Sequence, residues 1–191
     1  MNQGIFEHAL QFAMTVHAGM TRRSAKLPYI LHPLEAACIA STMTQDEEVL
    51  AAALLHDVVE DTPTTLAEVE EHFGPRVAEL VAAETENKRR DQPPADTWKI
   101  RKEESLAELR ASGRDVKILW LADKLSNARS FYRSFRERGS AIWNDFNMKD
   151  PKAQAWYYTT ISDIVRDELS DEMAWIEYDY LVREIFREEL S

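Results

Sequence analysis

Apolar side chains recur along almost the whole chain at the three- and four-residue spacing of an amphipathic helix. No stretch keeps the two-residue alternation of a β-strand for long, so the sequence predicts an all-α fold. The segments with the helical pattern are about residues 3–19, a segment that starts near His32-Pro33, and residues 46–61, 65–74, 75–86, 98–113, 115–135, 151–169 and 171–190.

Several of these segments carry signals for a helix end. Pro63 disfavours the α conformation of the residue before it, which ends the third helix. Thr65 and Glu68 have the spacing of a capping box before the fourth helix, and Gly74 suits the end of that helix. The polar segment 87–97 is the one clear loop.

The stretch AAALLHDVVEDT, residues 51–62, is apolar except near its end. In a continuous helix, side chains four residues apart lie above one another, and the polar ones here fall within roughly 140° of the circumference. They are His56, Asp57, Glu60 and Asp61. No lysine or arginine occurs between Lys26 and Arg76 to balance this charge locally.

A solvated helix face is the simpler interpretation of this polar stripe. However, carboxylates near the C-terminal end of a helix oppose its dipole, and carboxylates four residues apart repel each other. A divalent cation removes both objections, because it is often the largest local charge in a site. We therefore favour a metal site.

Two further residues complete a ligand set. His32 precedes Pro33 at the start of a helix, and Asp123 follows an apolar run in LWLADKLSNAR. A buried aspartate must be paired or bound to a metal. Two histidines and two aspartates offer nitrogen and oxygen donors without sulfur, which suits one Mn²⁺ or Fe²⁺ ion in an open site, or Zn²⁺.

The composition narrows the function classes. With 191 residues, 45% of them hydrophobic and 30% charged, the chain is typical of a soluble globular protein, and no linker divides the single domain expected over residues 1–191. The net charge of −11 argues against nucleic-acid partners. Cys38 is the one cysteine, which excludes a thiolate zinc site. We expect a cytoplasmic location and no membrane partner, because neither a signal peptide nor a membrane-length apolar run is evident.

The order His…His-Asp…Asp resembles that of the HD superfamily of metal-dependent phosphohydrolases. The segments YILHP, HDVVEDT and LADKLSNAR together resemble the hydrolase domain of the RelA/SpoT family, and the chain length is similar to that of stand-alone small alarmone hydrolases. The resemblance implies a compact multi-helix bundle around a central site for one metal ion, with Mn²⁺ preferred. The ligands that it implies are His32, His56, Asp57 and Asp123.

The resemblance also implies roles for the remaining polar residues of the HD segment. Glu60 and Asp61 match an acidic pair that orients or activates the attacking water. A bound metal ion would lower the pKa of that water, and one carboxylate would accept its proton.

For substrate binding, the implied residues come from three segments. They are Arg23, Lys99, Arg101, Lys124 and Asn127. Ser24, after Arg23, departs from the usual family pattern, so recognition of the base is open. For each cation near the loop 87–97, a solvated basic edge is the simpler alternative.

The leading functional hypothesis is hydrolysis of the 3′-pyrophosphate of guanosine tetra- or pentaphosphate (ppGpp, pppGpp) to GDP or GTP and pyrophosphate. The partner would be a small phosphorylated nucleotide. One alternative is another HD-family nucleotidase or nucleotide phosphohydrolase, and another is a nucleotide-binding regulatory module with little turnover.

Overall fold

The computed structural model describes residues 4–22, 27–89 and 91–190. Within these residues the regular structure is helical apart from one isolated β-bridge between Thr21 and Pro28, so the predicted all-α fold is confirmed. No helix among them is both long and apolar enough to span a lipid bilayer. The helices are α1 (Ile5–Val16), α2 (Leu31–Ala40), α3 (Glu47–Leu55), α4 (Val58–Asp61), α5 (Leu66–Phe73), α6 (Pro75–Glu84), α7 (Pro94–Ala111), α8 (Arg114–Arg138), the 3₁₀ helix η1 (Gly139–Asp145), α9 (Pro151–Leu169) and α10 (Met173–Ile185).

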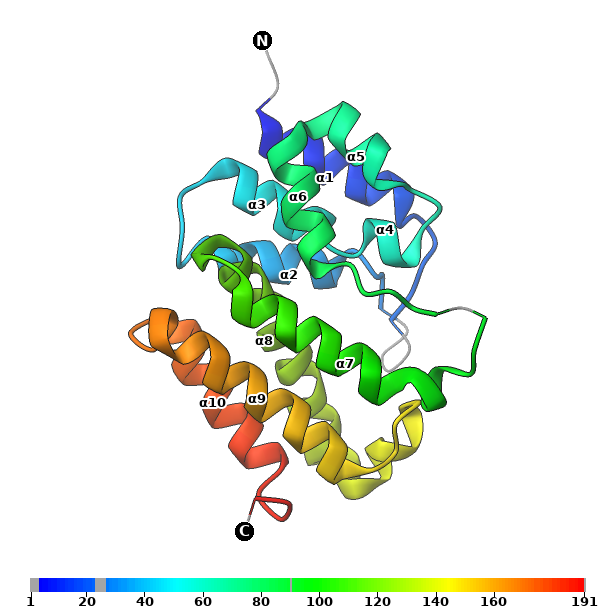
Figure 1. Cartoon of the computed structure of the whole chain (residues 1–191), viewed down its shortest axis with the longest axis vertical. Helices are drawn as coiled ribbons and strands as arrows, with labels where there is room; N and C mark the ends of the chain where they lie inside the picture. The colour runs from blue at the N-terminus through cyan, green and yellow to red at the C-terminus, as the bar shows by residue number, and fades with distance from the viewer. Residues whose placement is uncertain (1–3, 23–26, 90, 191) are drawn as a thin grey trace.

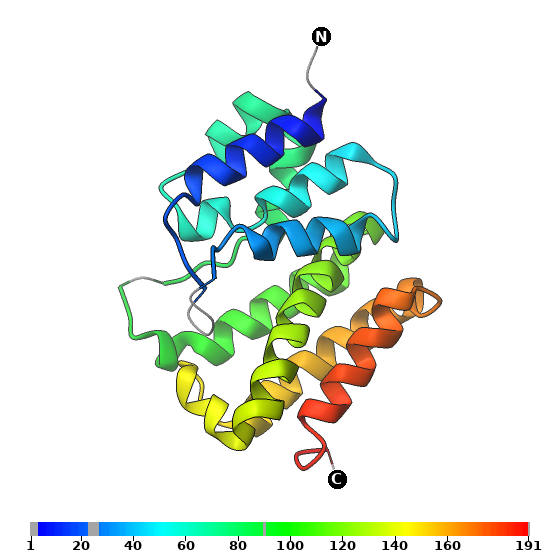
Figure 2. The ribbon, with the colours of Figure 1, turned by 180° about the vertical axis from the view of Figure 1, so that it is seen from behind.

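The long helix α8 connects the two halves of the structure. It packs against α2, α3 and α6 from one half and against α9, α10 and η1 from the other. Figure 1 shows α1–α6 in the upper half and α7, α9 and α10 below, and Figure 2 shows α8 from behind, between these two groups. Segments that are distant in the sequence therefore meet along α8.

The sequence of α8 accounts for this position. Nearly every side chain between residues 117 and 128 is buried, as expected for a helix that is apolar around its whole circumference. The buried polar residues of this stretch are Lys117, Asp123 and Ser126, and Lys124 and Asn127 are half-buried. Each of the buried ones needs a partner inside the protein.

The predicted capping residues occupy the helix ends. Thr65 and Glu68 form the complete capping box of α5, in which each side chain accepts a hydrogen bond from the backbone N–H of the other residue. Gly74 follows α5 with a φ of 87°, a backbone conformation that favours glycine. The confirmed signals are the local ones, which depend on a few neighbouring residues.

The prediction of one continuous helix over residues 46–61 was wrong. Helix α3 ends at Leu55, and α4 begins at Val58. The ring atom Nδ1 of His56 lies 2.9 Å from the carbonyl oxygen of Ala53, which in a continuous helix would accept the N–H of Asp57. This side-chain hydrogen bond competes with the helical one, and the chain turns at His56 and Asp57.

The start of α7 also differs from its prediction. The helix begins at Pro94, whereas the sequence predicted a loop up to residue 97. Proline is well suited to the first position of a helix because its missing N–H would have no partner there. The polar residues after Pro94 concealed the first turn.

The two glycines Gly74 and Gly113 provide a matched test of the backbone geometry. Their φ angles are 87° and −80°, and an added Cβ would meet no atom within 4 Å at either position. Gly74→Ala should lower the free energy of unfolding by about 1–2 kcal/mol, because the left-handed conformation strains an L-residue. Gly113→Ala should leave it unchanged or raise it by up to about 1 kcal/mol. Urea unfolding followed by circular dichroism measures both, and equal shifts would contradict the assigned backbone.

Candidate metal centre

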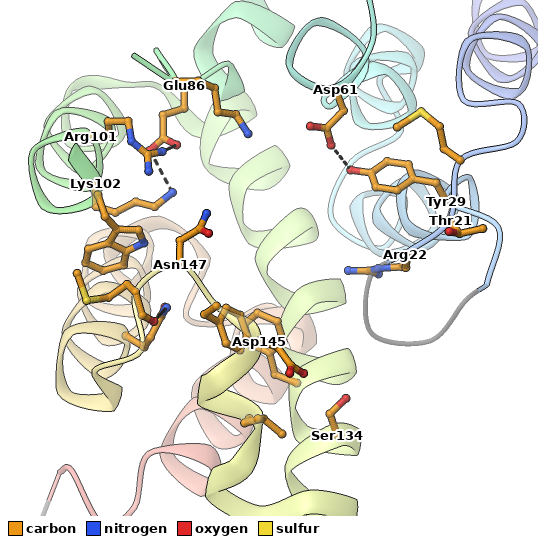
Figure 3. A pocket seen from close by; sticks show the side chains of 18 of the residues that line it. Thr21, Arg22, Tyr29, Asp61, Glu86, Arg101, Lys102, Ser134, Asp145 and Asn147 are labelled. Atoms are coloured by element: carbon orange, nitrogen blue, oxygen red, sulfur yellow. Dashed lines mark hydrogen bonds and ion pairs between the residues drawn. The ribbon is translucent and has the colours of Figure 1, made fainter. Parts of the chain in front are cut away.

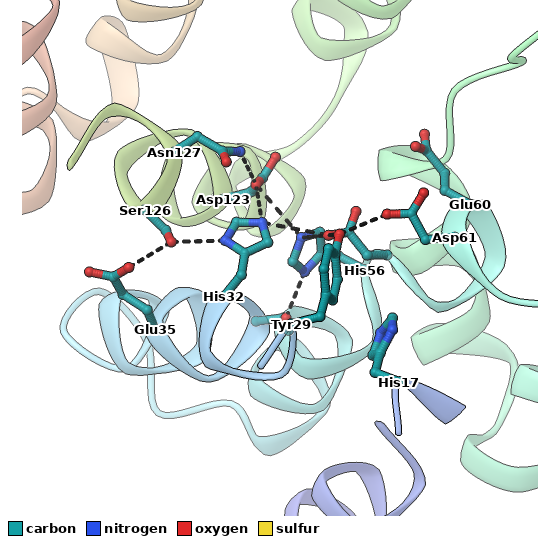
Figure 4. Close-up of polar contacts among 12 residues, drawn as sticks. His17, Tyr29, His32, Glu35, His56, Glu60, Asp61, Asp123, Ser126 and Asn127 are labelled. Atoms are coloured by element: carbon teal, nitrogen blue, oxygen red, sulfur yellow. Dashed lines mark hydrogen bonds and ion pairs between the residues drawn. The ribbon is translucent and has the colours of Figure 1, made fainter. Parts of the chain in front are cut away.

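The four predicted metal ligands lie together where three helical segments meet (Figure 4). His32 comes from the first turn of α2, His56 and Asp57 from the turn between α3 and α4, and Asp123 from α8. His32 Nε2 lies 3.0 Å from Asp123 Oδ1 and 3.5 Å from Asp57 Oδ2. His56 Nε2 lies 3.0 Å from Asp57 Oδ2 and 3.6 Å from Asp123 Oδ1. The structure thus brings the whole set together, although their role as ligands stays a prediction.

The donor atoms of this group suit a divalent metal ion. One atom each from His32, His56 and Asp57 lies within 4.8 Å of the other two. His56 Nε2 is buried, and its 3.0 Å contact with Asp57 Oδ2 lacks the geometry of a hydrogen bond, so the carboxylate faces this nitrogen without satisfying it fully. Imidazole nitrogens and carboxylate oxygens without sulfur are a donor set for a first-row divalent ion.

Burial and neighbouring charges act in opposite directions on the pKa values of this group. Burial alone would raise the pKa of Asp123, but Lys124 and the neighbouring imidazoles outweigh it and hold that pKa well below its usual range. Burial alone would lower the pKa of His56, but the carboxylates of Asp57 and Asp123 raise it to about 10. A metal ion therefore competes with a proton for Nε2 of this histidine.

Lys124 and Asn127, both predicted to bind substrate, contact Asp123. The ammonium group of Lys124 pairs with Asp123 Oδ2 and lies 4.9 Å from the ring centroid of Trp120. Asn127 Nδ2 donates to Asp123 Oδ1 at 2.7 Å, and Arg22 Nη2 donates to Asn127 Oδ1 at 2.8 Å. These bonds fix Asp123, and a contact with substrate stays a prediction for both residues.

The acidic pair on α4 is divided between two environments. The hydroxyl of Tyr29 lies 2.6 Å from Asp57 Oδ2 and 2.7 Å from Asp61 Oδ2, and its single hydrogen can be donated to one of them at a time. Burial and these two carboxylates raise the pKa of Tyr29 far above its usual range, so the hydroxyl stays protonated. Glu60 instead accepts from the backbone N–H of Glu86 and pairs with Lys88 Nζ, both at 2.6 Å.

A cavity of about 720 Å³ adjoins the metal centre (Figure 3). Tyr29 and Asp61 line it on one side. The lining also includes Lys88 from the loop before α7, and Arg101 and Lys102 from α7. The remaining wall includes Trp98, Phe131, Phe146, Asn147 and Met148. The cavity thus joins a carboxylate, several cations and aromatic surfaces next to the predicted ligands.

The cations of α7 are held by Glu86. Arg101 Nη1 pairs with Glu86 Oε2, and Lys102 Nζ lies 3.1 Å from Glu86 Oε1. The Lys102 ammonium group also lies 4.8 Å from the ring centroid of Tyr157 on α9. Burial lowers the pKa of Lys102, although Glu86 opposes this shift.

The structure does not bring Lys99 to the cavity with Arg101. Residues two apart on a helix do not share a face, so the two side chains point in different directions. Lys99 Nζ lies 3.0 Å from the ring centroid of Trp156 and 3.6 Å from Glu103 Oε1, and Lys99 is absent from the cavity lining. Arg23, another predicted substrate-binding residue, lies outside the described residues.

The sequence analysis did not single out Tyr29 and Glu86 as residues of this site, and among the cations it preferred Lys99 and Arg101 to Lys102. A signal for Lys102 was present, because Trp98 and Lys102 are four residues apart on one face of α7. Tyr29 stands three residues before His32 in the segment YILHP, which was a second usable signal. Glu86 gave none, because its partners come from α7.

Known proteins share both the sequence and the structure of this region. A family described as "HD domain" matches residues 9–150. The Escherichia coli protein "Bifunctional (p)ppGpp synthase/hydrolase SpoT" is 42% identical over 123 residues, which cover 62% of this chain. The Brucella abortus "GTP pyrophosphokinase rsh" is 37% identical over 132 residues, or 68% of the chain. In both cases the match spans 17% of the relative's length.

Solved structures match a larger share of the chain. A metazoan ortholog of SpoT, described as hydrolysing ppGpp, superposes with a TM-score of 0.74 at 27% identity and covers 96% of this chain and 97% of its own. A Listeria monocytogenes protein gives a TM-score of 0.71 at 34% identity, with 84% and 96% covered. The match to the metazoan protein covers enough of the chain to include the helices after residue 150.

Substitution of the clustered residues should remove metal binding. We expect His56→Ala and Asp123→Asn to weaken Mn²⁺ binding by about 100-fold or more, since loss of a supporting residue alone costs about 10–100-fold. Electron paramagnetic resonance titration of free Mn²⁺ measures the affinity. Glu103→Gln is the control, because Glu103 pairs with Lys99 on the surface. Unchanged affinity in both test variants would contradict the site.

Proposed function

Because the chain belongs to the HD-domain family, we propose that it is a metal-dependent hydrolase that converts ppGpp or pppGpp to GDP or GTP and pyrophosphate. The observation that carries this proposal is the convergence of two histidines and two aspartates beside a cavity that also holds Asp61, Lys88, Arg101 and Lys102. The similarity to SpoT and to a metazoan ortholog described as hydrolysing ppGpp supports this choice of substrate.

The ligands of the metal ion would be His32, His56, Asp57 and Asp123. Their mixed nitrogen and oxygen donors favour Mn²⁺ as the cofactor, with Fe²⁺ and Zn²⁺ as alternatives. When bound, the ion supplies an activated water and stabilises negative charge that develops on the attacked phosphorus.

The two carboxylates of α4 would have different roles. Asp61 faces the cavity and receives a hydrogen bond from Tyr29, so it is placed to accept the proton of the attacking water. Glu60 is engaged by Lys88 and by the Glu86 N–H, so it would hold Lys88 at the cavity until a phosphate group binds. Hydrolysis breaks the bond between the ribose 3′ oxygen and phosphorus. The oxygen of one water passes to pyrophosphate, and the 3′ oxygen gains a proton.

The phosphates would bind the cations across the cavity. Lys88, Arg101 and Lys102 are each paired with a glutamate of the protein, and a pyrophosphate group carries more charge than the carboxylate it would displace. Charge-assisted bonds of this kind are stronger than neutral ones. Lys124 and Asn127 would complete the site next to Asp123.

The direct test is release of pyrophosphate from ppGpp in the presence of Mn²⁺. We expect turnover by the unaltered protein, and a fall in kcat of about 10²–10⁴-fold in Asp61→Asn, because general base catalysis contributes roughly that factor. The variant should still bind Mn²⁺, since Asp61 is not among the predicted ligands. Full activity in Asp61→Asn would refute the assigned base.

A nucleotide panel separates this proposal from the alternatives. Equal hydrolysis of nucleotides without a 3′-pyrophosphate would favour a general nucleotidase. Tight binding of ppGpp without turnover in Mn²⁺ would favour a regulatory module.

The cations of α7 should act on substrate binding. Lys102→Met should raise KM for ppGpp by roughly 10–100-fold, which corresponds to loss of a charge-assisted hydrogen bond worth about 1.5–3 kcal/mol. Steady-state kinetics measure this change. Arg110→Met is the matched control, because Arg110 is an exposed cation of the same helix and does not line the cavity. An unchanged KM in Lys102→Met would exclude Lys102 from the phosphate site.

A further inference from the structure

A line of hydrogen bonds leads from His32 away from the cavity (Figure 4). His32 Nδ1 lies 2.8 Å from Ser126 Oγ, and Ser126 Oγ lies 2.8 Å from Glu35 Oε2. The other oxygen of Glu35 accepts a hydrogen bond from Arg129 Nη1 at 3.1 Å. Arg129 is in turn held by both carboxylate oxygens of Glu177 on α10, at 2.7 and 2.6 Å.

The chemistry of these groups sets the direction of each bond. An ionised carboxylate has no hydrogen to donate, so the hydroxyl of Ser126 donates to Glu35. The serine oxygen is then the acceptor for His32, and Nδ1 of the imidazole carries the hydrogen. In the neutral ring this leaves the lone pair on Nε2, where a metal ion would bind. In the absence of an ion, Asp123 Oδ1 at 3.0 Å favours a second hydrogen on Nε2.

We propose that Ser126 and Glu35 are positioning residues that hold His32 in the Nδ1–H tautomer, with Nε2 directed to a divalent metal ion. The proposal rests on the metal site of the proposed function. Partners of this kind fix the ring orientation and tautomer of a ligating histidine and strengthen its binding. Ser126 has no solvent exposure, so water does not replace Glu35 as its partner.

The second histidine shows why this arrangement matters for His32. His56 Nδ1 bonds to the backbone carbonyl of Ala53, which is an acceptor whatever side chains surround it. His32 has a hydroxyl in that place, and a hydroxyl can donate or accept. Only the carboxylate beyond Ser126 removes this ambiguity. The tautomer of His32 therefore depends on side chains that substitution can change.

Another part of the chain provides a matched control. Ser162 on α9 is also buried, its hydroxyl donates to Asp179 Oδ1 at 2.9 Å, and Asp179 pairs with Arg183. This serine, carboxylate and arginine repeat the order of Ser126, Glu35 and Arg129 without a histidine. Ser162→Ala thus removes the same type of bond away from the metal centre.

The experiment compares Ser126→Ala, Glu35→Gln and Ser162→Ala by two measurements. Mn²⁺ affinity, measured by electron paramagnetic resonance, should fall by about 10–100-fold in the first two variants and stay within about 2-fold in Ser162→Ala. Histidine ¹⁵N spectra of the metal-free protein should show hydrogen on Nδ1 of His32 in the unaltered protein, with or without a second hydrogen on Nε2. In Glu35→Gln they should show a mixture of tautomers, because an amide can donate as well as accept.

The two readouts separate the two proposals. Absence of Mn²⁺ binding in the unaltered protein would refute the metal site, while the spectra would still decide the tautomer. Hydrogen on Nε2 but not on Nδ1 of His32 in the unaltered protein would overturn the positioning role. Unchanged Mn²⁺ affinity in both Ser126→Ala and Glu35→Gln, or an equal loss in Ser162→Ala, would overturn it as well. Glu35 is partly exposed, so Glu35→Gln keeps the test valid if Ser126→Ala does not fold.

Discussion

Asp123 is buried and Asp57 is half-buried beside it, and much of the surrounding structure compensates the charge of these two carboxylates. An ionised group removed from water costs several kcal/mol unless partners replace its hydration. The partners here are the imidazoles of His32 and His56 and the ammonium group of Lys124. They come from α2, from the end of α3 and from α8, so the packing of these helices and the charge balance depend on each other. This dependence explains why polar residues occupy positions in α8 that the apolar pattern would otherwise reserve for the core.

The same rule applies across the cavity, where the protein supplies both signs of charge. Glu60 pairs with Lys88, and Glu86 pairs with Arg101 and Lys102. Under the proposed function, a ligand enters this site by exchanging one anion for another. A ligand with a single negative charge gains little from such an exchange, whereas a pyrophosphate group offers more charge and more acceptor oxygens than a carboxylate. We expect the internal ion pairs to act as a filter for highly charged nucleotides, in addition to keeping the cations in place.

The sequence predicted features that depend on a few neighbouring residues better than features that depend on contacts between distant helices. The capping box at Thr65 and the metal-ligand candidates were recognisable because each stands out within a few residues, as a cap before a helix or a polar group in an apolar run. Lys99 was proposed to bind substrate, but its side chain lies over Trp156. The family resemblance identified only the segment that contains Lys99, whereas the position of a residue around the helix decides which way its side chain points. Glu86 could not be found, since its importance comes from α7, which packs beside it. The resemblance gave the chemistry of the site, and tertiary packing decided which cations face the cavity.

The largest difference from prediction, the break between α3 and α4, follows from the same histidine that faces the metal site. In an unbroken helix His56 and Asp57 would point about 100° apart. The ring of His56 instead bonds to the carbonyl of Ala53, three residues before it, and the chain turns. That turn brings Asp57 Oδ2 to within 3.0 Å of His56 Nε2 and starts α4, which places Asp61 beside Tyr29. One hydrogen bond therefore orients a candidate ligand, ends a helix and allows adjacent residues to converge. A helical projection of the sequence cannot show this break, because it assumes a continuous helix through residues 46–61.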